Sequence, residues 1–261
     1  MILRDKVVVV TGVGPGLGRE VARVALRDGA RVAVASRTEE KLRKAAEELD
    51  PSGARVLSVP TDVGDAARCE ALMRAAAERF GGVDAVVQVA ALDTLLGTLE
   101  TTSDDDWRRG LEQNVLGTVH VVRAAVPHLE ARGGGAIVLI GSQAMWLPPR
   151  LPQIAYAAAK GALLAAMLHL AKELGPKRIR VNMVVPTWMW GPPVEGYVRW
   201  QSKSRGLAPE EVVAEITANM PLGEIPADED VAEAVAFFCS DRARMITGQS
   251  LLVNAGELLR A

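Results

Sequence analysis

Two side chains capable of acid–base chemistry lie four residues apart in the segment "IAYAAAKGALLAAMLHLAKEL". The segment has the apolar pattern of a long buried helix, and residues four apart share one helix face. Tyr156 and Lys160 are therefore expected side by side. A tyrosine and a lysine at this spacing arise by chance in roughly 5% of chains of this composition, so the pair is suggestive rather than decisive.

Two further polar residues occur where chemistry is expected. Ser142 ends the strand-like segment "AIVLIGS", at the edge where parallel sheets bind ligands, although a turn serine would look the same. Asn114 interrupts an apolar helical pattern in "LEQNVLGTVHVV". Asparagine is a poor helix-interior residue, so Asn114 either faces solvent or completes a polar network.

A glycine-rich turn, "TGVGPGLG", follows the first apolar strand and precedes a helix. Backbone N–H groups and the helix dipole make such a turn an anion site, and glycine lets the backbone approach a pyrophosphate. No Gly-Lys-Ser/Thr follows, which excludes a P-loop. The turn predicts a dinucleotide site, with contacts expected from Gly12, Gly14, Gly16, Leu17 and Gly18.

The ends of the next two strands indicate which dinucleotide. Where NAD-binding chains carry an acid for the ribose 2′-hydroxyl, this chain has Ser36 and Arg37. A guanidinium suits a 2′-phosphate, so NADP(H) is favoured, and NAD(H) stays an alternative. Asp62 is expected to accept a hydrogen bond from the adenine amino group, or else to cap a turn.

These segments belong to a regular alternation of strands and helices. Strand-like runs lie at 6–11, 30–36, 55–60, 83–90, 136–141, 178–185 and 249–253. Near-continuous apolar strands with helices between them predict a single-domain, Rossmann-type, doubly wound parallel sheet of about seven strands over residues 1–261. The connection at about 187–225 is too long for a simple loop and is expected to be a substrate lid, although an extra helical subdomain is the alternative, and "APEEVVAEIT" predicts a helix within it.

Together these motifs resemble the classical short-chain dehydrogenase/reductase family over essentially the whole chain. "TGVGPGLG" is similar to that family's TGxxxGxG turn, "YAAAK" to its Tyr-x-x-x-Lys, and "DV" at 62–63 to its adenine contact. Ser142 and Asn114 occupy the places of its catalytic serine and helix-kink asparagine. "RIRVNMVVPT" and "TGQSLLVNAG" resemble its late-strand signatures.

The resemblance implies a role for each residue. Tyr156 donates a proton to a carbonyl oxygen, helped by a Lys160 ammonium that lowers the tyrosine pKa from its usual value near 10. Lys160 also holds the nicotinamide ribose, Ser142 stabilises the developing oxyanion, and Asn114 supports a water chain. Further cofactor contacts are expected from Val63, Val89, Ala90, Pro186, Thr187 and Trp188.

The chain departs from the family pattern twice. Asn-Asn-Ala-Gly is replaced by "QVAA" at 88–91, and Pro-Gly-x-x-x-Thr by "PTWMWG" at 186–191. The first change is tolerable, because that stretch contacts cofactor mostly through its backbone. The second leaves nicotinamide anchoring in doubt, with Thr187 as the substitute threonine.

Aromatic residues gather after Ser142 and in the expected lid, which predicts a hydrophobic ketone or secondary alcohol as substrate. The expected contacts are Gln143, Met145, Trp146, Trp188, Trp190, Tyr197 and Trp200. Some of these aromatics could instead join the lid to the body or to another subunit. Arg199, Lys203 and Arg205 suggest a 3-ketoacyl thioester as an alternative, and NAD-dependent alcohol oxidation is another. A non-catalytic NADP(H) sensor is the alternative of a different class.

Composition narrows the remaining function classes. The net charge of −2 gives no attraction to nucleic acid or anionic lipid, and no apolar run is long enough to predict a membrane span. Two distant cysteines, with no signal-peptide pattern, predict a reduced, cytoplasmic protein. The three histidines form no ligand cluster, so no metal is expected. The family resemblance implies a homotetramer or homodimer.

Overall fold

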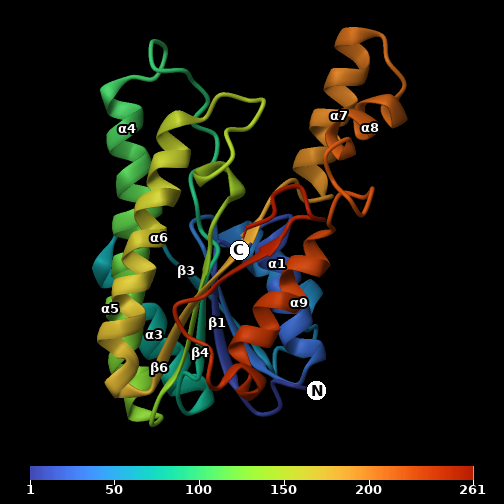
Figure 1. The fold of residues 1–261 in the computed structure, drawn as a ribbon. Helices are drawn as coiled ribbons and strands as arrows, with labels where there is room; N and C mark the ends of the chain where they lie inside the picture. Colours follow the sequence, from blue (N-terminus) through green and yellow to red (C-terminus); the bar gives the residue numbers. More distant parts are fainter. Residues whose placement is uncertain (261) are drawn as a thin grey trace.

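The computed structural model describes residues 1–260, in which seven parallel strands form one sheet (Figure 1). The strands are β1 (Val7–Thr11), β2 (Arg31–Ser36), β3 (Val56–Pro60), β4 (Ala85–Gln88), β5 (Gly135–Ile140), β6 (Ile179–Pro186) and β7 (Ser250–Val253). Their order is β3-β2-β1-β4-β5-β6-β7, and every neighbouring pair is parallel. The predicted doubly wound fold class is confirmed. The order in which strands are added to the sheet reverses between β1 and β4, which is the switch point where such sheets bind ligands.

Helices cover both faces of the sheet, as the buried strands require. They are α1 (Leu17–Arg27), α2 (Glu39–Leu49), α3 (Ala66–Phe80), α4 (Asp104–Leu111), α5 (Gly117–Ala131), α6 (Ile154–Leu174), α7 (Pro192–Arg205), α8 (Pro209–Thr217) and α9 (Asp228–Cys239). α1, α2 and α9 pack on one face, and α3, α5 and α6 on the other (Figure 1). A π-helical turn over Glu112–Leu116 joins α4 to α5.

The connection between β6 and α9 contains two helices, α7 and α8, which rise beyond the carboxyl edge of the sheet (Figure 1). They share a small core of their own, built on Val198, Val212, Ile216 and Met220. The helix predicted at 208–217 is present as α8. α7 was not predicted.

The apolar character of α6 corrects the expectation that no segment is long and apolar enough to span a membrane. By length and composition alone, Ile154–Lys177 could cross a membrane, although a core helix of a water-soluble protein meets the same criterion. α6 packs on the sheet through buried residues such as Leu163 and Met167. Its composition is therefore weak evidence for a span.

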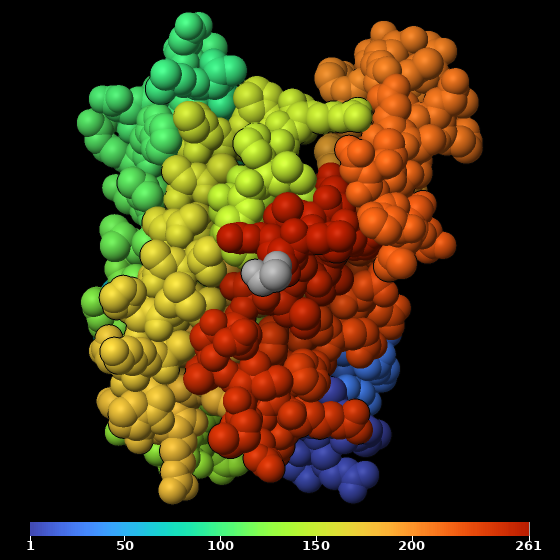
Figure 2. All heavy atoms as spheres, in the orientation of Figure 1, coloured from blue at the N-terminus to red at the C-terminus, as the bar shows by residue number. Residues whose placement is uncertain are grey.

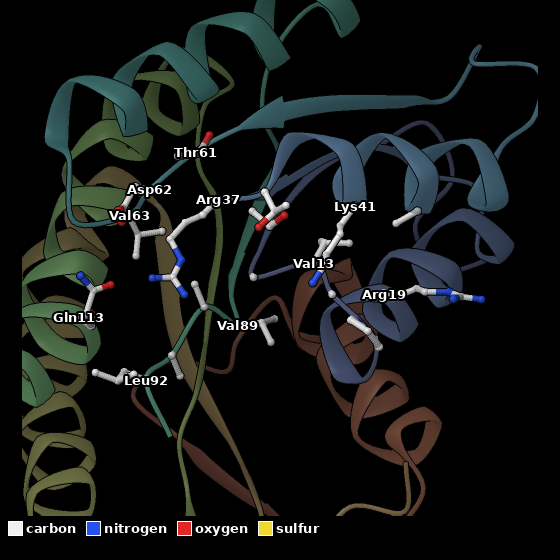
Figure 3. Close-up of a pocket in the computed structure, with 18 of the residues that line it drawn as sticks. Val13, Arg19, Arg37, Lys41, Thr61, Asp62, Val63, Val89, Leu92 and Gln113 are labelled. Carbon is white, nitrogen blue, oxygen red and sulfur yellow. The ribbon is translucent and has the colours of Figure 1, made fainter. Parts of the chain in front are cut away.

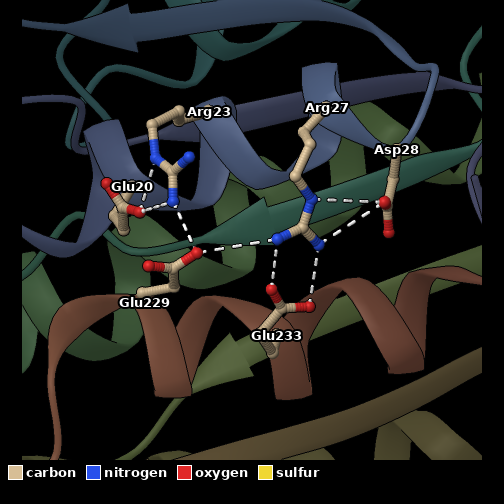
Figure 4. A network of polar contacts seen from close by, with 6 residues as sticks. All are labelled: Glu20, Arg23, Arg27, Asp28, Glu229 and Glu233. Carbon is tan, nitrogen blue, oxygen red and sulfur yellow. Dashed lines mark hydrogen bonds and ion pairs between the residues drawn. The ribbon is translucent and has the colours of Figure 1, made fainter.

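Ion pairs join α1, the helix after the glycine turn, to α9, the helix after the predicted lid at about 187–225. Arg23 Nη2 lies 2.7 Å from Glu229 Oε1, and Arg27 Nη2 lies 2.9 Å from Glu233 Oε2 (Figure 4). All four side chains remain 42–50% exposed, so each pair contributes at most about 1 kcal/mol. The network fixes the lateral placement of the two helices more than it stabilises the fold.

Candidate active site

A cleft lies along the carboxyl edge of the sheet, at the switch point between β1 and β4. It consists of two adjoining cavities of about 670 and 640 Å³. Both are lined by Gly12, Gly14, Pro15, Val89, Ala91 and Asp93. The first cavity extends over β2, β3 and α2, and the second extends toward α6 and the lid. The cleft is long enough in both directions to separate a nucleotide end from a reaction end.

The four glycines of the turn serve two different purposes. A Cβ on Gly12 would lie 2.4 Å from the Ala90 backbone nitrogen, and one on Gly18 would lie 2.3 Å from the Gly12 oxygen. These two glycines are required by packing within the protein. A Cβ on Gly14 would meet nothing within 4 Å, and the φ of Gly16 is +124°, which only glycine adopts freely. A Cβ on Gly16 would lie 3.5 Å from Asp228 Oδ2, whereas the backbone at Gly14 is open to the cleft near the N-terminus of α1 and fits a pyrophosphate.

Basic side chains surround the far end of the first cavity. Arg37 and Lys41 point into it in Figure 3, from the end of β2 and the first turn of α2. Neither forms an ion pair with another residue in the described range 1–260. Arg19 and Lys44 also line this cavity, and Arg19 lies 3.1 Å from Glu48. The cavity therefore carries net positive charge where an adenosine 2′-phosphate would lie.

The other predicted adenosine contacts line the same cavity. Ser36, Asp62 and Val63 are all in its wall. Asp62 Oδ1 accepts a hydrogen bond from the Gly64 N–H at 3.0 Å, so the side chain caps its own turn, as the simpler interpretation proposed. The second carboxylate oxygen forms no hydrogen bond with residues 1–260. Asp62 can therefore cap the turn and accept from an adenine at once.

The first departure from the family pattern is explained by one side chain. Gln88, 2% exposed, accepts a short hydrogen bond from the Thr11 hydroxyl and donates to the Ala90 carbonyl at 3.2 Å. Gln88 thus ties the end of β4 to the end of β1. Val89 and Ala90 consequently keep their backbone along the cleft wall. The replacement preserves the backbone path expected to contact the cofactor.

Ser142, Tyr156 and Lys160 all line the second cavity. Ser142 follows β5, whereas Tyr156 and Lys160 lie on the first two turns of α6. Lys160 is only 3% exposed, and its Nζ donates to the Ile140 carbonyl at 2.7 Å and lies 5.6 Å from the Tyr156 ring centre. Three residues predicted from separate motifs are thus brought to one cavity wall.

Burial dominates the electrostatics of the pair. Although part of Tyr156 is accessible from the cavity, the surrounding protein raises its pKa to about 12, and hydrogen bonding with Ser142 opposes this shift. Burial lowers the pKa of Lys160 to about 8, and the Asp93 charge opposes that shift. The expected lowering of the Tyr156 pKa by Lys160 is therefore not found. At neutral pH the structure holds a protonated phenol beside an ammonium.

Asn114 adopts the second of the two arrangements considered for it, in a buried polar network. It is 1% exposed and lies in the π-helical turn. Its amide donates to the carbonyls of Leu92 and Gly110 at 3.1 and 3.0 Å, and its Oδ1 accepts from the Leu92 N–H at 3.0 Å. The side chain thereby anchors the loop after β4. Its part in a water chain stays a prediction.

The end of β6 forms the junction of the cleft with the lid. Pro186, Thr187 and Trp188 line the second cavity, as do Leu17 and Gly18 from the glycine turn. The Thr187 hydroxyl donates a short hydrogen bond to Glu257 Oε2, from the segment after β7. Thr187 thus stands in the cavity, where a substitute for the missing threonine was expected.

The predicted lid gives the second cavity an apolar wall. Trp188 and Tyr197 line the cavity with ring centres 5.0 Å apart, and Met189, Val194 and Ile216 lie beside them. From the body, Gln143 lines the same cavity. Arg150 reaches across to Glu215 of α8 at 3.7 Å, joining the loop after Ser142 to the lid.

Four expected substrate contacts do not line the cavity. Met145 and Trp146 pack against the core on the α3, α5 and α6 face, because the short helical turn after Ser142 directs them away from the cleft. Trp190 is 40% exposed beside the start of α9, and Trp200 is 60% exposed on α7. Aromatic composition alone could not distinguish these residues from Trp188.

Several cavity residues were missed at the sequence level. Lys41 lies in the first turn of α2, four residues after Arg37, and a second cation this close to Arg37 in the sequence could have signalled a shared role. Asp93 lines both cavities, and Glu257 reaches the second one from the C-terminal segment. No local pattern marks Asp93 or Glu257. Within residues 1–260, no group of three metal-ligating side chains occurs.

Known proteins share both sequence and fold with this chain. A family model described as enoyl-(acyl carrier protein) reductase matches residues 12–257. Mouse dehydrogenase/reductase SDR family member 4 is 34% identical over 255 residues, covering 97% of this chain and 88% of the relative. The chain belongs to the short-chain dehydrogenase/reductase family. It is thus an oxidoreductase of alcohol or carbonyl groups that uses a nicotinamide dinucleotide.

Two solved structures of this family are informative. L-sorbose reductase from Gluconobacter frateurii, complexed with NADPH and L-sorbose, superposes with a TM-score of 0.92 at 28% identity, covering 100% of both chains. A variant of actinorhodin polyketide ketoreductase with NADPH gives a TM-score of 0.87 at 31% identity, covering 97% of both chains. The family thus includes NADPH-bound members that act on quite different carbonyl compounds.

Proposed function

We propose that this dehydrogenase/reductase transfers a hydride between NADP(H) and a hydrophobic ketone or secondary alcohol. The observation that carries the proposal is the cleft itself. Its basic end presents Arg37 and Lys41, and its reaction end presents Ser142, Tyr156 and Lys160. The NADPH bound by the sorbose reductase and the ketoreductase supports the same cofactor.

The residues of the second cavity suit carbonyl reduction. When bound, the cofactor supplies the hydride that the carbonyl carbon accepts. Tyr156 donates its phenolic proton to the carbonyl oxygen, and the Ser142 hydroxyl hydrogen-bonds that oxygen as charge develops. Lys160 holds positive charge beside the resulting phenolate. Burial keeps the Tyr156 phenol protonated at neutral pH, which is the form that can donate a proton in carbonyl reduction.

The lid supports a hydrophobic substrate. Trp188, Met189 and Tyr197 give the cavity an apolar wall opposite the catalytic residues. The 3-ketoacyl thioester alternative loses support, because two of its three cations are already paired. Arg205 makes two hydrogen bonds to Glu215 at 2.8 and 2.7 Å, and Arg199 lies 3.6 Å from Glu195.

Cofactor titration tests the proposal directly. Purified protein is titrated with NADPH and with NADH, following tryptophan fluorescence. We expect tighter NADPH binding, with a loss of about 10- to 100-fold in Arg37→Ala, the range for one charge-assisted hydrogen bond. Arg43→Ala is the matched control, because Arg43 lies on α2, which begins two residues after Arg37, and it pairs with Glu47 and does not line the cavity. Equal or tighter NADH binding would favour the NAD-dependent alternative.

A sensor without turnover is distinguished by its response to Tyr156→Phe. If the parent protein turns over no carbonyl compound or alcohol, and Tyr156→Phe keeps the full cofactor response, the sensor interpretation wins. The acid–base pair in the cavity argues against it, since a sensor needs no proton donor. A homotetramer or homodimer, in the cytoplasm, also stays part of the proposal; light scattering of the purified protein measures the assembly.

A further inference from the structure

The C-terminal segment after β7 brings an unexpected carboxylate into the reaction end of the cleft. Glu257 lines the second cavity together with Ser142, Tyr156 and Lys160. In Figure 2 the C-terminal segment lies between the part of the chain that follows β5 and the lid. Nothing in the acid–base chemistry derived above uses this carboxylate.

The Glu257 carboxylate is held by two neutral donors at one of its oxygens. Oε2 accepts from the Gln143 amide at 2.8 Å and from the Thr187 hydroxyl by a short hydrogen bond. Gln143 directly follows Ser142, and Thr187 directly follows β6. The carboxylate is therefore tied to both segments that flank the expected position of a reacting carbonyl.

The supporting shell fixes the orientation of this carboxylate. Gln143 is 4% exposed, and its Oε1 accepts from the Asn254 amide at 2.7 Å. The same Asn254 amide donates to the Leu258 carbonyl at 2.9 Å, and the Glu257 N–H donates to the Asn254 carbonyl at 2.9 Å. At the far end, Arg260 lies 4.2 Å from the ring centre of Trp146. Such an acceptor is preorganised, so a ligand does not have to order it.

The second oxygen of the carboxylate is available to a ligand. Glu257 Oε1 forms no hydrogen bond with any residue in 1–260, and no buried side-chain oxygen in that range lacks a partner. Oε1 is therefore accessible. A carboxylate oxygen only accepts hydrogen bonds, so its complement on a substrate is a donor. Both donors on Oε2 are uncharged, and a substrate hydroxyl at Oε1 would be a donor of the same kind.

We propose that Glu257 is a specificity-determining residue that binds a hydroxyl group of the substrate near the reacting carbonyl. The inference rests on the proposed carbonyl reduction and refines its substrate class. The preferred substrate is a hydroxyketone, or in reverse a diol, whose apolar body packs against Trp188 and Tyr197. The lid then selects the body of the substrate, and Glu257 selects the substituent.

Matched ketone pairs test this assignment. In each pair a methyl group replaces the hydroxyl: 2-hydroxyacetophenone against propiophenone, and 4-hydroxybutan-2-one against pentan-2-one. The measured quantity is the ratio of kcat/KM within a pair, with NADPH. We expect this ratio to fall about 10- to 100-fold in Glu257→Leu for at least one pair, and less in Glu257→Gln, which keeps the shape and one acceptor. Comparing ratios between variants cancels the intrinsic reactivity of each ketone.

The control is Glu210→Gln, an equal change of charge at an exposed site on α8 that does not line the cavity. It should leave both ratios unchanged. An unchanged ratio in Glu257→Leu, or an equal loss for both members of each pair, would overturn the inference. A preference for amino ketones over hydroxyketones would contradict the hydroxyl assignment. It would indicate that Glu257 binds a cationic group of the substrate instead. A parent protein that binds NADPH but reduces no ketone would instead refute the proposed function, and this inference with it.

Discussion

Burial of the Lys160 ammonium should destabilise the folded protein. An uncharged side chain of similar size at this position should therefore increase stability. Burial lowers the pKa of Lys160 from 10.5 to about 8, and at about 1.4 kcal/mol per pKa unit this corresponds to roughly 3 kcal/mol. Lys160→Met removes that cost but leaves the Ile140 carbonyl without its donor, a loss of about 1–3 kcal/mol. We expect the variant to be inactive and up to about 2 kcal/mol more stable than the parent at pH 7.

The pH dependence of this difference is the sharper test. Below pH 8 the lysine is protonated in both folded and unfolded protein, so the cost is fully present. Between pH 8 and 10.5 the folded state releases the proton while the unfolded state keeps it, so the parent gains stability as the pH rises. The advantage of Lys160→Met should therefore shrink by about 3 kcal/mol over this window.

Chemical denaturation of parent and variant at half-unit steps from pH 7 to pH 10.5 measures this difference. Tyr156, whose pKa is about 12 in the folded protein, stays protonated there over this range, and its titration near pH 10 in the unfolded state is common to both proteins. Lys172→Met is the control, since Lys172 lies on the same helix but is exposed. A difference between Lys160→Met and parent that does not vary with pH would refute the argument that burial destabilises the Lys160 ammonium.

Other substitutions separate the roles of neighbouring residues. Tyr156→Phe should lower kcat about 10²- to 10⁴-fold in steady-state assays while leaving the NADPH dissociation constant nearly unchanged, because only the proton donor is lost. Gly12→Ala should destabilise the fold by on the order of 3 kcal/mol in thermal unfolding, because of its backbone clash and φ of +71°. Gly14→Ala should instead keep the melting temperature and weaken NADPH binding; the opposite ranking would disprove the division of the glycines. Glu233→Gln should cost at most about 1 kcal/mol, an effect that 1 M salt removes if it comes from the Arg27 pair.

Most of the sheet was predictable because its strands are buried on both faces. A run such as "VVVVT" at β1 has one plausible environment, and the glycine turn after it fixes the start of the next helix. α7 was missed because it begins with two prolines after Gly191, a combination that looks like a loop. Proline is nevertheless favoured in the first turn of a helix, so the signal was present and misinterpreted.

The site was predictable where function constrains spacing and unpredictable where it depends on packing. Ser142, Tyr156 and Lys160 could be located from motifs, and the structure brings them to one wall. The pKa of Tyr156 could not be predicted from the sequence, since it follows from burial by segments that are distant in the chain. Trp146 and Trp188 have the same side chain, yet one packs against the core and the other lines the cavity. Glu257 was invisible for a related reason, because only the path of the chain after β7 brings it there.

The different roles of the glycines in the turn affect which of them would change if a descendant of this chain lost cofactor binding. Gly12 and Gly18 are held by contacts inside the protein, so they would persist in a copy that no longer needs a dinucleotide. A Cβ added at Gly14 would meet no protein atom within 4 Å, so nothing in the packing of the protein requires glycine there. A duplicate that had abandoned cofactor binding would therefore still display most of the glycine signature. Position 14 would be among the first of the four to change, so a substitution there would be the sequence sign of lost cofactor binding.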